Sequence, residues 1–297
     1  MLLVKLQGGL GNQMFQYAAA KGISKTNQHI YLDHQFLEKN DTDTGDFTAR
    51  KYELQVFKNL KAYKANPRQL KLFRSSGFYY KFLRFFFKTA VIRQIENEYV
   101  SFPQASGKTV NLYLDGYFQS EKYFKHLRKL LMKEFAFPPL DTVNEQLRNK
   151  IINAPNAVSL HIRRGDYLKS PIIYDVHGLI PLSYYYKALN ILRSKHPDLS
   201  LFIFSDDSNW AQANLNVPDT ETYFVTGNQS GNSWKDMALM SCCKHHVIAN
   251  SSFSWWGAWL SQNNGDVFAP SNWFNAVNVR FNINDFIPDN WYIIQHD

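Results

Sequence analysis

Two adjacent arginines stand where the chain could hold an anion. Arg163 and Arg164 lie in HIRRGDY, residues 161–167, directly after the apolar segment AVSLHI. A guanidinium stays charged and presents a planar fork of N–H donors that matches phosphate oxygens. Since side chains alternate along a strand, one arginine can face a ligand while its neighbour anchors the structure. The alternatives are two buried arginines paired with carboxylates and, at residues 164–166, an exposed adhesion tripeptide.

Two aspartates follow another apolar segment. FIFSDD, residues 202–207, ends in Asp206 and Asp207. A carboxylate there can accept hydrogen bonds from two adjacent N–H donors, as on the edge of guanine, or from ribose hydroxyls. Neighbouring aspartates point in different directions and no histidine lies nearby, so we expect no metal site. The alternative is that these aspartates cap a helix that begins near Asn209.

A glycine-rich turn near the start of the chain could approach a negative group. GGLGNQ, residues 8–13, lies between an expected strand and an expected helix. Its glycines would let backbone N–H groups come close to a ligand at the helix N-terminus, where anions are favoured. The segment is neither GxGxxG nor a Walker loop. Alternatively, the glycines only make a tight turn with Asn12 as N-cap.

The segment NSSFSWWGAWL, residues 250–260, combines hydroxyls with indoles. Ser251 and Ser252 fall at an expected helix N-terminus, where hydroxyls and unpaired N–H groups could hold a phosphate. We expect Trp255, Trp256 and Trp259 to pack between this helix and a sheet, because spacings of three and four share a helix face. The alternative is a sugar platform made by one tryptophan.

The elements that must position these residues alternate between strands and helices. The first segment reads as strand 2–6, helix 12–25 and strand 30–33, whereas residues 35–110 are expected to hold helices and loops. In the second half, five apolar strands alternate with helices; they are 157–162, 199–205, 222–225, 245–249 and 266–269. Such alternation is typical of parallel sheets covered on both faces. We therefore predict an α/β fold with two Rossmann-like domains.

The boundary between these domains is predicted from a double proline. It lies in FAFPPLDT, residues 135–142, and divides the chain into domains 1–138 and 139–297. The residues after about 270 could cross back to the first domain. Ligands in such folds bind beyond the carboxyl ends of the strands, where the motifs above are placed.

Composition limits the class of protein. The chain has 297 residues, of which 45% are hydrophobic and 16% aromatic, as in a folded globular protein. No apolar run approaches the roughly 20 residues of a membrane span, and the first residues do not resemble a signal peptide. The two cysteines, Cys242 and Cys243, are adjacent and offer no framework for zinc. We expect a cytoplasmic protein.

Basic charge is concentrated in one region. No acidic residue lies between Glu53 and Glu96, although many lysines and arginines do, and FYYKFLRFFFK, residues 78–88, adds aromatic side chains. Such segments can rest on anionic membranes, so one interpretation is that residues 58–93 make peripheral contact with the inner face of a membrane. The alternative is a core helix with snorkelling lysines. No nucleic-acid-binding module accompanies the charge, so we do not expect a nucleic acid partner.

Taken in order, GGLGNQMFQYA, LDGYFQSEKYF (residues 114–124), HIRRGDY, FSDD and NSSFSWWGAWL resemble the bacterial α-1,2-fucosyltransferases. The resemblance covers nearly the whole chain and is weakest at residues 35–110. It implies a two-domain GT-B fold whose Rossmann-like domains face each other across a cleft. It also implies inverting transfer of L-fucose from GDP-fucose to the 2-hydroxyl of a terminal galactose, without an obligatory metal or cofactor. The acceptor would be a galactose-terminated oligosaccharide, free or lipid-linked.

The resemblance also suggests residue roles. Arg163 would contact the β-phosphate of GDP, Arg164 and Asp166 would support it or face the acceptor, and Asn12 would approach the diphosphate or fucose from the first, acceptor-side domain. The remaining residues expected to bind the donor are Gly9, Gly11 and Gln13, His161 by the nucleoside, Asp206 and Asp207 on guanine or ribose, and Ser251, Ser252 and Phe253 on phosphate.

An inverting displacement calls for a base that takes the proton of the acceptor hydroxyl. The candidates are Asp166, Asp115 and His177, in that order, and related enzymes without a conventional base leave open that none is needed. Two other functions remain open. One is a glycosyltransferase with another nucleotide sugar or another fucosyl linkage, and the other is a protein that binds nucleotides or glycans without chemistry.

Overall fold

The computed structural model describes residues 1–24, 28–44, 47–94, 99–100, 111–229, 231–275 and 277–296. Two compact units are formed, unit 1 by Met1–Asp43 with Ala49–Ala136 and unit 2 by Thr44–Thr48 with Phe137–Asp297. The chain is thus divided just after residue 136, whereas the double proline placed the boundary after 138. The C-terminal segment belongs to unit 2.

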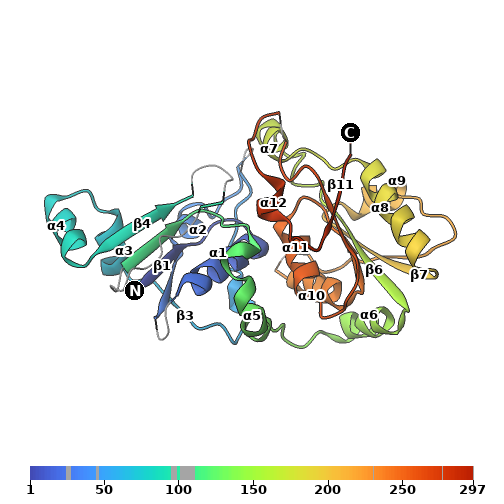
Figure 1. Cartoon of the computed structure of the whole chain (residues 1–297), viewed down its shortest axis with the longest axis horizontal. Coiled ribbons are helices and arrows are strands. Elements are labelled where there is room, and N and C mark those ends of the chain that lie inside the picture. Colours follow the sequence, from blue (N-terminus) through green and yellow to red (C-terminus); the bar gives the residue numbers. More distant parts are fainter. Residues whose placement is uncertain are drawn as a thin grey trace. The chain divides into compact units, whose positions relative to one another are not determined.

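Unit 1 is built on a parallel sheet of five strands in the order β3-β2-β1-β5-β4 (Figure 1). The strands are β1 Leu2–Lys5, β2 Ile30–Asp33, β3 Ala62–Lys64, β4 Thr89–Arg93 and β5 Asn111–Asp115. The helices are α1 Leu10–Ile23, α2 Gln35–Lys39, α3 Pro67–Arg74, α4 Phe78–Phe86 and α5 Arg128–Glu134, with 3₁₀ turns η1 Leu54–Val56, η2 Glu121–Tyr123 and η3 Lys125–Leu127.

Two strands of unit 1 were not expected. β3 and β4 fall in the region for which helices and loops were predicted, and residues 45–46, 95–98 and 101–110 of that region lie outside the described part. Both strands lie at sheet edges, where little of each strand is buried. Since a half-exposed edge strand needs no apolar run, composition gives it no clear signal.

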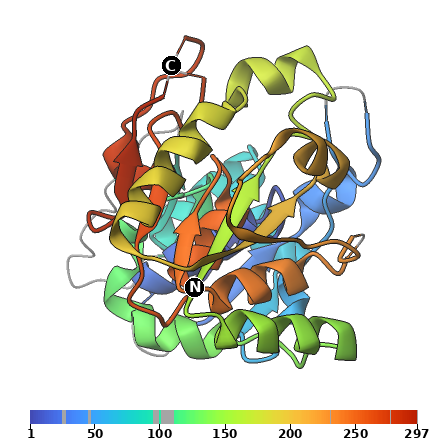
Figure 2. The ribbon, with the colours of Figure 1, turned by 90° about the vertical axis from the view of Figure 1, so that its right-hand side faces the viewer.

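Unit 2 is built on a parallel sheet of six strands in the order β11-β10-β9-β6-β7-β8 (Figure 2). The strands are β6 Asn156–Ile162, β7 Leu199–Ser205, β8 Glu221–Phe224, β9 His245–Val247, β10 Val267–Pro270 and β11 Tyr292–Ile294. The helices are α6 Thr142–Asn153, α7 Pro171–His177, α8 Leu182–Lys195, α9 Ser208–Asn214, α10 Trp234–Cys242, α11 Ser252–Trp259 and α12 Ile283–Phe286.

Both faces of the second sheet are covered, which explains why its central strands are apolar throughout. On β7, Leu201 and Ile203 point to one face and pack with residues of α8 and α9. Phe202 and Phe204 point to the other face and pack against α6 and α10. Alternation along the strand therefore buries all of its positions except Ser205 between two helical layers. The predicted α/β fold with parallel sheets is confirmed, and β11 adds a strand that was not expected.

Helix α1 carries the glycine-rich turn at its start and packs tightly at its end. A Cβ added at Gly22 would lie 2.0 Å from the carbonyl oxygen of Tyr123, which is backbone and cannot rotate away. Close packing here fixes the end of the helix whose beginning holds GGLGNQ. Among the described residues, no helix has both the length and the apolar character of a membrane span.

We expect Gly22→Ala to destabilise the protein by about 2 kcal/mol, because overpacking against backbone outweighs the roughly 1 kcal/mol that alanine gains in a helix. Gly77→Ala is the matched control, since its nearest neighbour would be a side-chain atom of Tyr80 at 3.9 Å. Urea denaturation of both variants measures the difference. A Gly22→Ala midpoint at or above the wild-type value would contradict this packing.

Candidate active site

The turn that follows β6 is organised by one carboxylate from the neighbouring strand. β6 and β7 pair in parallel with Ile162 opposite Ser205, so their carboxyl ends meet at one edge. Asp206 Oδ1 accepts the backbone N–H of Arg164 at 2.8 Å, and Oδ2 accepts that of Asp166 at 3.2 Å. Asp206 therefore fixes the HIRRGDY turn.

Gly165 allows this close approach. A Cβ added there would lie 3.2 Å from both the backbone oxygen and a carboxylate oxygen of Asp206. A larger residue would push the turn away from the carboxylate that receives its N–H groups.

Arg163 is held between two carboxylates. Its Nη2 pairs with Asp166, and its Nε lies 3.4 Å from Asp206 Oδ2. Burial alone would lower the pKa of Arg163, but Asp166 and Asp206 raise it above its ordinary value. Burial would raise the pKa of Asp206, but Arg163 and the backbone N–H donors hold it below its ordinary value. The pair is therefore ionised at neutral pH.

Arg163 forms the ion pairs with carboxylates that the alternative interpretation expects. These pairs do not prevent it from also binding an anion. The side chain of Arg163 is 21% exposed. Its Nη1 makes no hydrogen bond to any described residue, which leaves N–H donors on the side of the fork away from the carboxylates. A contact of Arg163 with phosphate stays a prediction.

Arg164, in the turn after β6, and Asp207, at the start of α9, form a second, looser pair. Arg164 Nε lies 3.9 Å from Asp207 Oδ2, and its guanidinium carbon lies 4.3 Å above the ring of Trp210. Asp207 is also the N-cap of α9, because its Oδ1 accepts the backbone N–H of Trp210 at 3.1 Å. The capping alternative is confirmed for Asp207, and roles of Asp206 and Asp207 on guanine or ribose stay predictions.

His161 is a buried, neutral residue next to this centre. It is 4% exposed and its ring lies 5.9 Å from that of Phe253. Burial, then the charge of Arg163, lowers the pKa of His161 to about 3. Its Nδ1 is buried and has no hydrogen-bond partner in the described part of the chain. Contact with a nucleoside stays a prediction.

Ser251 begins α11 as expected, and the tryptophans brace that helix. Ser251 is the N-cap and its Oγ accepts the backbone N–H of Phe253 at 3.3 Å, with Ser252 as the first helical residue. Trp255 and Trp256 are fully buried, and Trp259 is nearly so. Trp255 Nε1 donates to the carbonyl of Phe286 at 2.8 Å. The sugar-platform alternative is wrong, because a buried ring cannot stack on a ligand.

Tyr167 and Asn250 tie these segments together and were not assigned a role from sequence. Tyr167 Oη donates to the carbonyl of Asn250 at 2.9 Å, and Asn250 Nδ2 donates to the carbonyl of His177 at 2.9 Å. The rings of Tyr167 and His177 stack at 4.5 Å and 6°. Tyr167 ends the motif HIRRGDY and Asn250 begins the motif NSSFSWWGAWL. Their residue types and positions do not show in the sequence that they connect the two segments.

The base candidates differ in their surroundings. Burial, with Arg163 adding to it and Asp166 opposing it, lowers the pKa of His177 to about 4, so His177 is neutral but a weak base. Asp115, at the end of β5, has Oδ1 3.0 Å from Lys5 Nζ and Oδ2 3.3 Å from Arg93 Nε. This carboxylate lines a cavity of about 230 Å³ at the carboxyl edge of the first sheet.

The glycine-rich turn of unit 1 corrects one interpretation. Gly9, not Asn12, is the N-cap of α1. Gly8 has a φ of +76°, and a Cβ there would lie 2.3 Å from Asn12 Nδ2, so the turn requires glycine. Asn12 Oδ1 accepts a hydrogen bond from Gln119 Nε2 at 2.7 Å, which links GGLGNQ to the motif LDGYFQSEKYF.

Gln13 is a structural residue of this turn. It is fully buried. Its Nε2 donates to the carbonyls of Gly8 at 2.9 Å and Lys51 at 2.8 Å, while its Oε1 accepts the N–H of Glu53 at 2.9 Å. The amide is therefore used by the protein. Gly11 is buried and Gly9 partly exposed, and their contact with a diphosphate stays a prediction.

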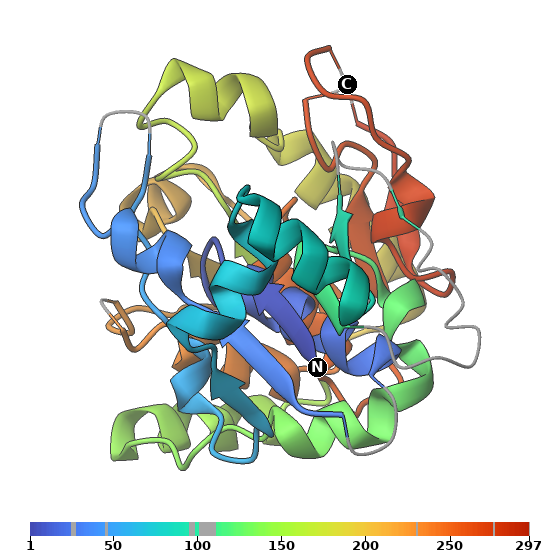
Figure 3. The same cartoon turned by 90° about the vertical axis from the view of Figure 1, so that its left-hand side faces the viewer.

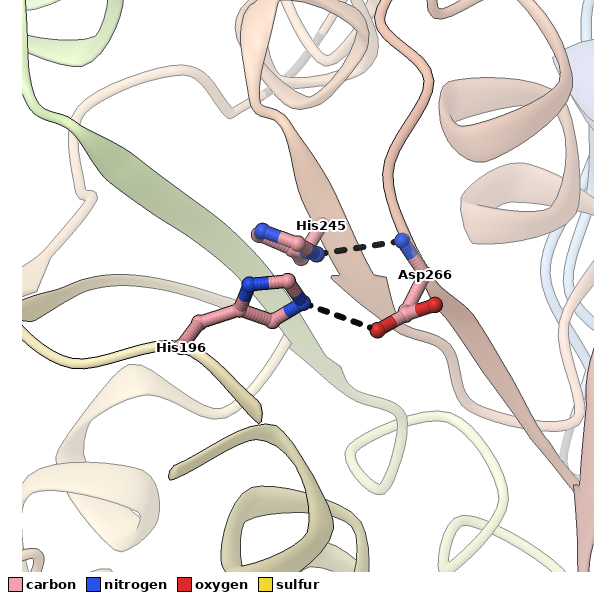
Figure 4. A group of neighbouring side chains, drawn as sticks. All are labelled: His196, His245 and Asp266. Carbon is pink, nitrogen blue, oxygen red and sulfur yellow. Dashed lines mark hydrogen bonds and ion pairs between the residues drawn. The ribbon is translucent and has the colours of Figure 1, made fainter. Parts of the chain in front are cut away.

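One group of side chains in the described residues has the composition of a metal site (Figure 4). His196 Nε2 lies 3.0 Å from Asp266 Oδ2, and His245 Nδ1 accepts the backbone N–H of Asp266 at 3.0 Å. An accepting Nδ1 puts the proton of neutral His245 on Nε2, so neither nitrogen is ready to bind a metal. Lys195 Nζ also lies 3.5 Å from the carboxylate. The group lies at the amino ends of β9 and β10 and acts as a structural network.

Residues 1–295 match the model of glycosyl transferase family 11. The chain is 32% identical to an α-1,2-colitosyltransferase of Escherichia coli over 99% of both proteins, and 32% identical to the O-antigen biosynthesis glycosyltransferase WbnK of Escherichia coli over 92% of this chain and 95% of that one. It is 30% identical to galactoside 2-α-L-fucosyltransferase SEC1 of Bos taurus over 50% of this chain and 42% of the relative.

A solved structure similar to this chain is that of NodZ α-1,6-fucosyltransferase co-crystallised with GDP. The TM-score is 0.49 at 12% identity, and the similarity covers 86% of this chain and 91% of that one.

The neighbouring aspartates provide a matched pair of variants. We expect Asp206→Asn to destabilise the protein by about 3 kcal/mol, because it removes one of the two counter-charges of Arg163 and the carboxylate that accepts the N–H groups of the turn. Asp207→Asn is expected to cost less than about 1 kcal/mol, because asparagine caps a helix as well as aspartate does. Urea denaturation at pH 7 measures both. Equal losses would show that the turn does not depend on Asp206.

We expect the protein to lose stability in mild acid, because several of its histidines are buried in the neutral form. Burial is the main cause that lowers the pKa of His161 and His246 to about 3 and that of His177 and His245 to about 4. The unfolded chain then binds more protons below about pH 6.5, so stability is present above that pH and is lost as pH falls. Each group can contribute on the order of 1 kcal/mol per pH unit.

Asp236 opposes this trend, because burial raises its pKa to about 7 and its contribution is lost as pH rises. We therefore expect the free energy of unfolding to fall between pH 6.5 and pH 5, and to fall more steeply in Asp236→Asn. Urea titrations at half-unit pH steps test both slopes. A flat profile in the variant would mean that the histidines are not held neutral.

Proposed function

The chain belongs to glycosyl transferase family 11, and on that premise we propose that it transfers L-fucose from GDP-fucose to the 2-hydroxyl of a terminal galactose. The product would be an α-1,2 linkage formed with inversion. The observation that carries the proposal is the guanidinium of Arg163, held by Asp166 and Asp206 at the carboxyl end of β6. In parallel α/β folds this is the edge where ligands bind.

The chemistry of the donor fits this edge. As the bond to fucose breaks, negative charge develops on the departing diphosphate. A guanidinium fixed in advance by two carboxylates meets that charge without reorganising, and such stabilisation can supply several kcal/mol of the barrier. The N-terminus of α11, with Ser251 and Ser252, would add N–H and hydroxyl donors for phosphate.

The acceptor proton needs a destination, and Asp166 remains our first candidate for the base. It lies beside Arg163 in the turn, where a carboxylate can both orient the guanidinium and receive a proton. Asp115 and His177 follow it. The alternative remains that a loosely bonded fucosyl cation and the departing diphosphate need little help from a base. We also propose that Asn12, in the glycine-rich turn, contacts the diphosphate or the fucose of the donor.

A second candidate donor is favoured by one comparison. The α-1,2-colitosyltransferase is 32% identical over 99% of both proteins. Colitose is L-fucose without its 3-hydroxyl, so the two donors share the GDP, the leaving group and the linkage. A site that hydrogen-bonds the 3-hydroxyl would discriminate strongly between them, because an unpaired buried polar group is costly.

The deciding experiment supplies the purified full chain with GDP-fucose or GDP-colitose and a panel of galactosides that includes lactose, with and without EDTA. We expect GDP release and an α-1,2-fucosyl galactoside, unchanged by EDTA. Preferred use of GDP-colitose would show that the proposed donor is wrong. A product with another linkage would show that the proposed α-1,2 linkage is wrong. Binding of GDP without any turnover would instead support a non-catalytic binding protein.

Turnover should depend on the planar fork of N–H donors of Arg163 as well as on its positive charge. We expect Arg163→Lys to lower kcat about tenfold, because the charge stays but the fork of donors is lost. Arg163→Ala should lower it roughly 100- to 1,000-fold and should also destabilise the fold, because it leaves two carboxylates unpaired. Arg148→Lys on α6, where Arg148 pairs with exposed Glu145, is the control. Wild-type turnover by a folded Arg163→Lys protein would remove this role.

A further inference from the structure

Helix α4 exposes nearly its whole aromatic content. Phe78 is 87% exposed and Phe85 is 85% exposed, and none of the residues of α4 is buried. The other large exposed side chains of this helix are Tyr79, Phe82 and Phe86. The alternative of a core helix with snorkelling lysines is therefore wrong for α4. A contiguous apolar surface of this kind marks an interaction site.

The exposed rings form one continuous face, which we call the aromatic face: Phe78, Tyr79, Phe82, Phe85 and Phe86. At about 100° per residue these positions fall within an arc of roughly 120°. Tyr80, Leu83 and Arg84 lie on the remaining arc and are only partly exposed. The helix is thus amphipathic, but its apolar side faces solvent and not the protein core. In Figure 3, α4 (teal) lies on the side of unit 1 nearest the viewer.

Arg84 explains how the helix is held in this orientation. Its Nη1 donates to the carbonyls of Leu72 at 3.1 Å and Ser75 at 2.8 Å, and lies 3.4 Å from that of Phe73. These carbonyls end α3, which itself packs against the first sheet through Leu70 and Phe73. Arg84 is therefore a structural anchor, and its hydrogen bonds turn the aromatic face outward.

The charged residues of α3 and α4 are all basic. Lys81 and Lys88 are exposed, and Lys81 lies at the margin of the aromatic face. Arg68 and Lys71 on α3 are exposed as well. No acidic residue occurs between Glu53 and Glu96 in the sequence. A second copy of the same surface would meet it with the same charge, whereas an anionic lipid surface would complement it.

We propose that the aromatic face and its flanking lysines dock unit 1 on an anionic phospholipid bilayer, with α4 lying in the plane of the interface. Aromatic side chains enter the boundary between headgroups and acyl chains, and lysines pair with anionic headgroups. Within residues 58–93, the proposed membrane contact is thus made by α4. The residues of α4 that face the lipid are distinct from Arg84, which anchors the helix to α3. The inference does not depend on the proposed function, because it requires no donor or acceptor.

The test is co-sedimentation of the full chain with vesicles of phosphatidylglycerol and phosphatidylcholine, compared with vesicles of phosphatidylcholine alone. We expect binding to the anionic vesicles only, and release as salt is raised, because the lysine contribution is screened. The triple variant Phe78→Ser, Phe82→Ser, Phe85→Ser should lose at least tenfold in partition coefficient. Lys81→Gln should lose about fivefold.

Two matched controls keep the outcome specific. Val143→Ser with Ile152→Ser removes exposed apolar side chains from α6, and Lys129→Gln removes an exposed lysine from α5. Both should bind vesicles as the wild type does. Circular dichroism checks that all variants are folded, and light scattering gives their oligomeric state.

Three results would overturn the proposal. The first is no binding of wild-type protein to anionic vesicles, and the second is binding that the α4 variants leave unchanged. The third is a wild-type dimer that the aromatic variant turns into a monomer while neither binds vesicles, which would identify the aromatic face as an interface between copies. None of these readouts involves turnover, so each is distinguishable from a failure of the proposed transfer reaction.

Discussion

The candidate donor site depends on one carboxylate at the end of β7. Asp206 accepts two backbone N–H groups of the turn after β6 and pairs with Arg163. Parallel pairing of β6 and β7 brings these groups to the same edge, and Gly165 leaves room for the contact. Without Asp206, the partly buried guanidinium of Arg163 would keep only one counter-charge, and the turn would lose the acceptors of its N–H groups. The same carboxylate therefore fixes the position of the turn and balances the charge of Arg163.

Most polar side chains of the motifs are occupied by the protein itself. Gln13 bridges three backbone groups, Asp207 caps α9, and Ser251 caps α11. A family motif therefore specifies the shape of a loop as much as contact with a ligand. The reaction we propose then needs few direct contacts, because a rigid turn with one charged fork already supplies a preorganised counter-charge for a diphosphate.

Two aromatic-rich helices show how similar compositions lead to opposite surroundings. In α11 the tryptophans are buried and pack on one another, and Trp255 donates a hydrogen bond to the backbone carbonyl of Phe286. In α4 the phenylalanines are exposed, because the arc that holds Arg84 is the one fixed to α3. The hydrophobic effect favours burial in both cases, and only the second helix has its apolar side left for an outside partner.

The sequence by itself determined the alternation of strands and helices in unit 2, the helix starts after β7 and β9, and the motif residues that gather at the carboxyl edge; helix α7, which follows β6, was not expected. These follow from local periodicity and from capping residues, which act over a few positions. Only the tertiary structure decided that Gly9 rather than Asn12 caps α1, that Asp206 braces the turn while Asp207 caps a helix, and that Tyr167 and Asn250 join distant segments. It also placed edge strands β3 and β4 and turned the aromatic face of α4 outward. These outcomes depend on partners many residues away, whose identity is fixed by packing and not by the spacing of residues along the chain.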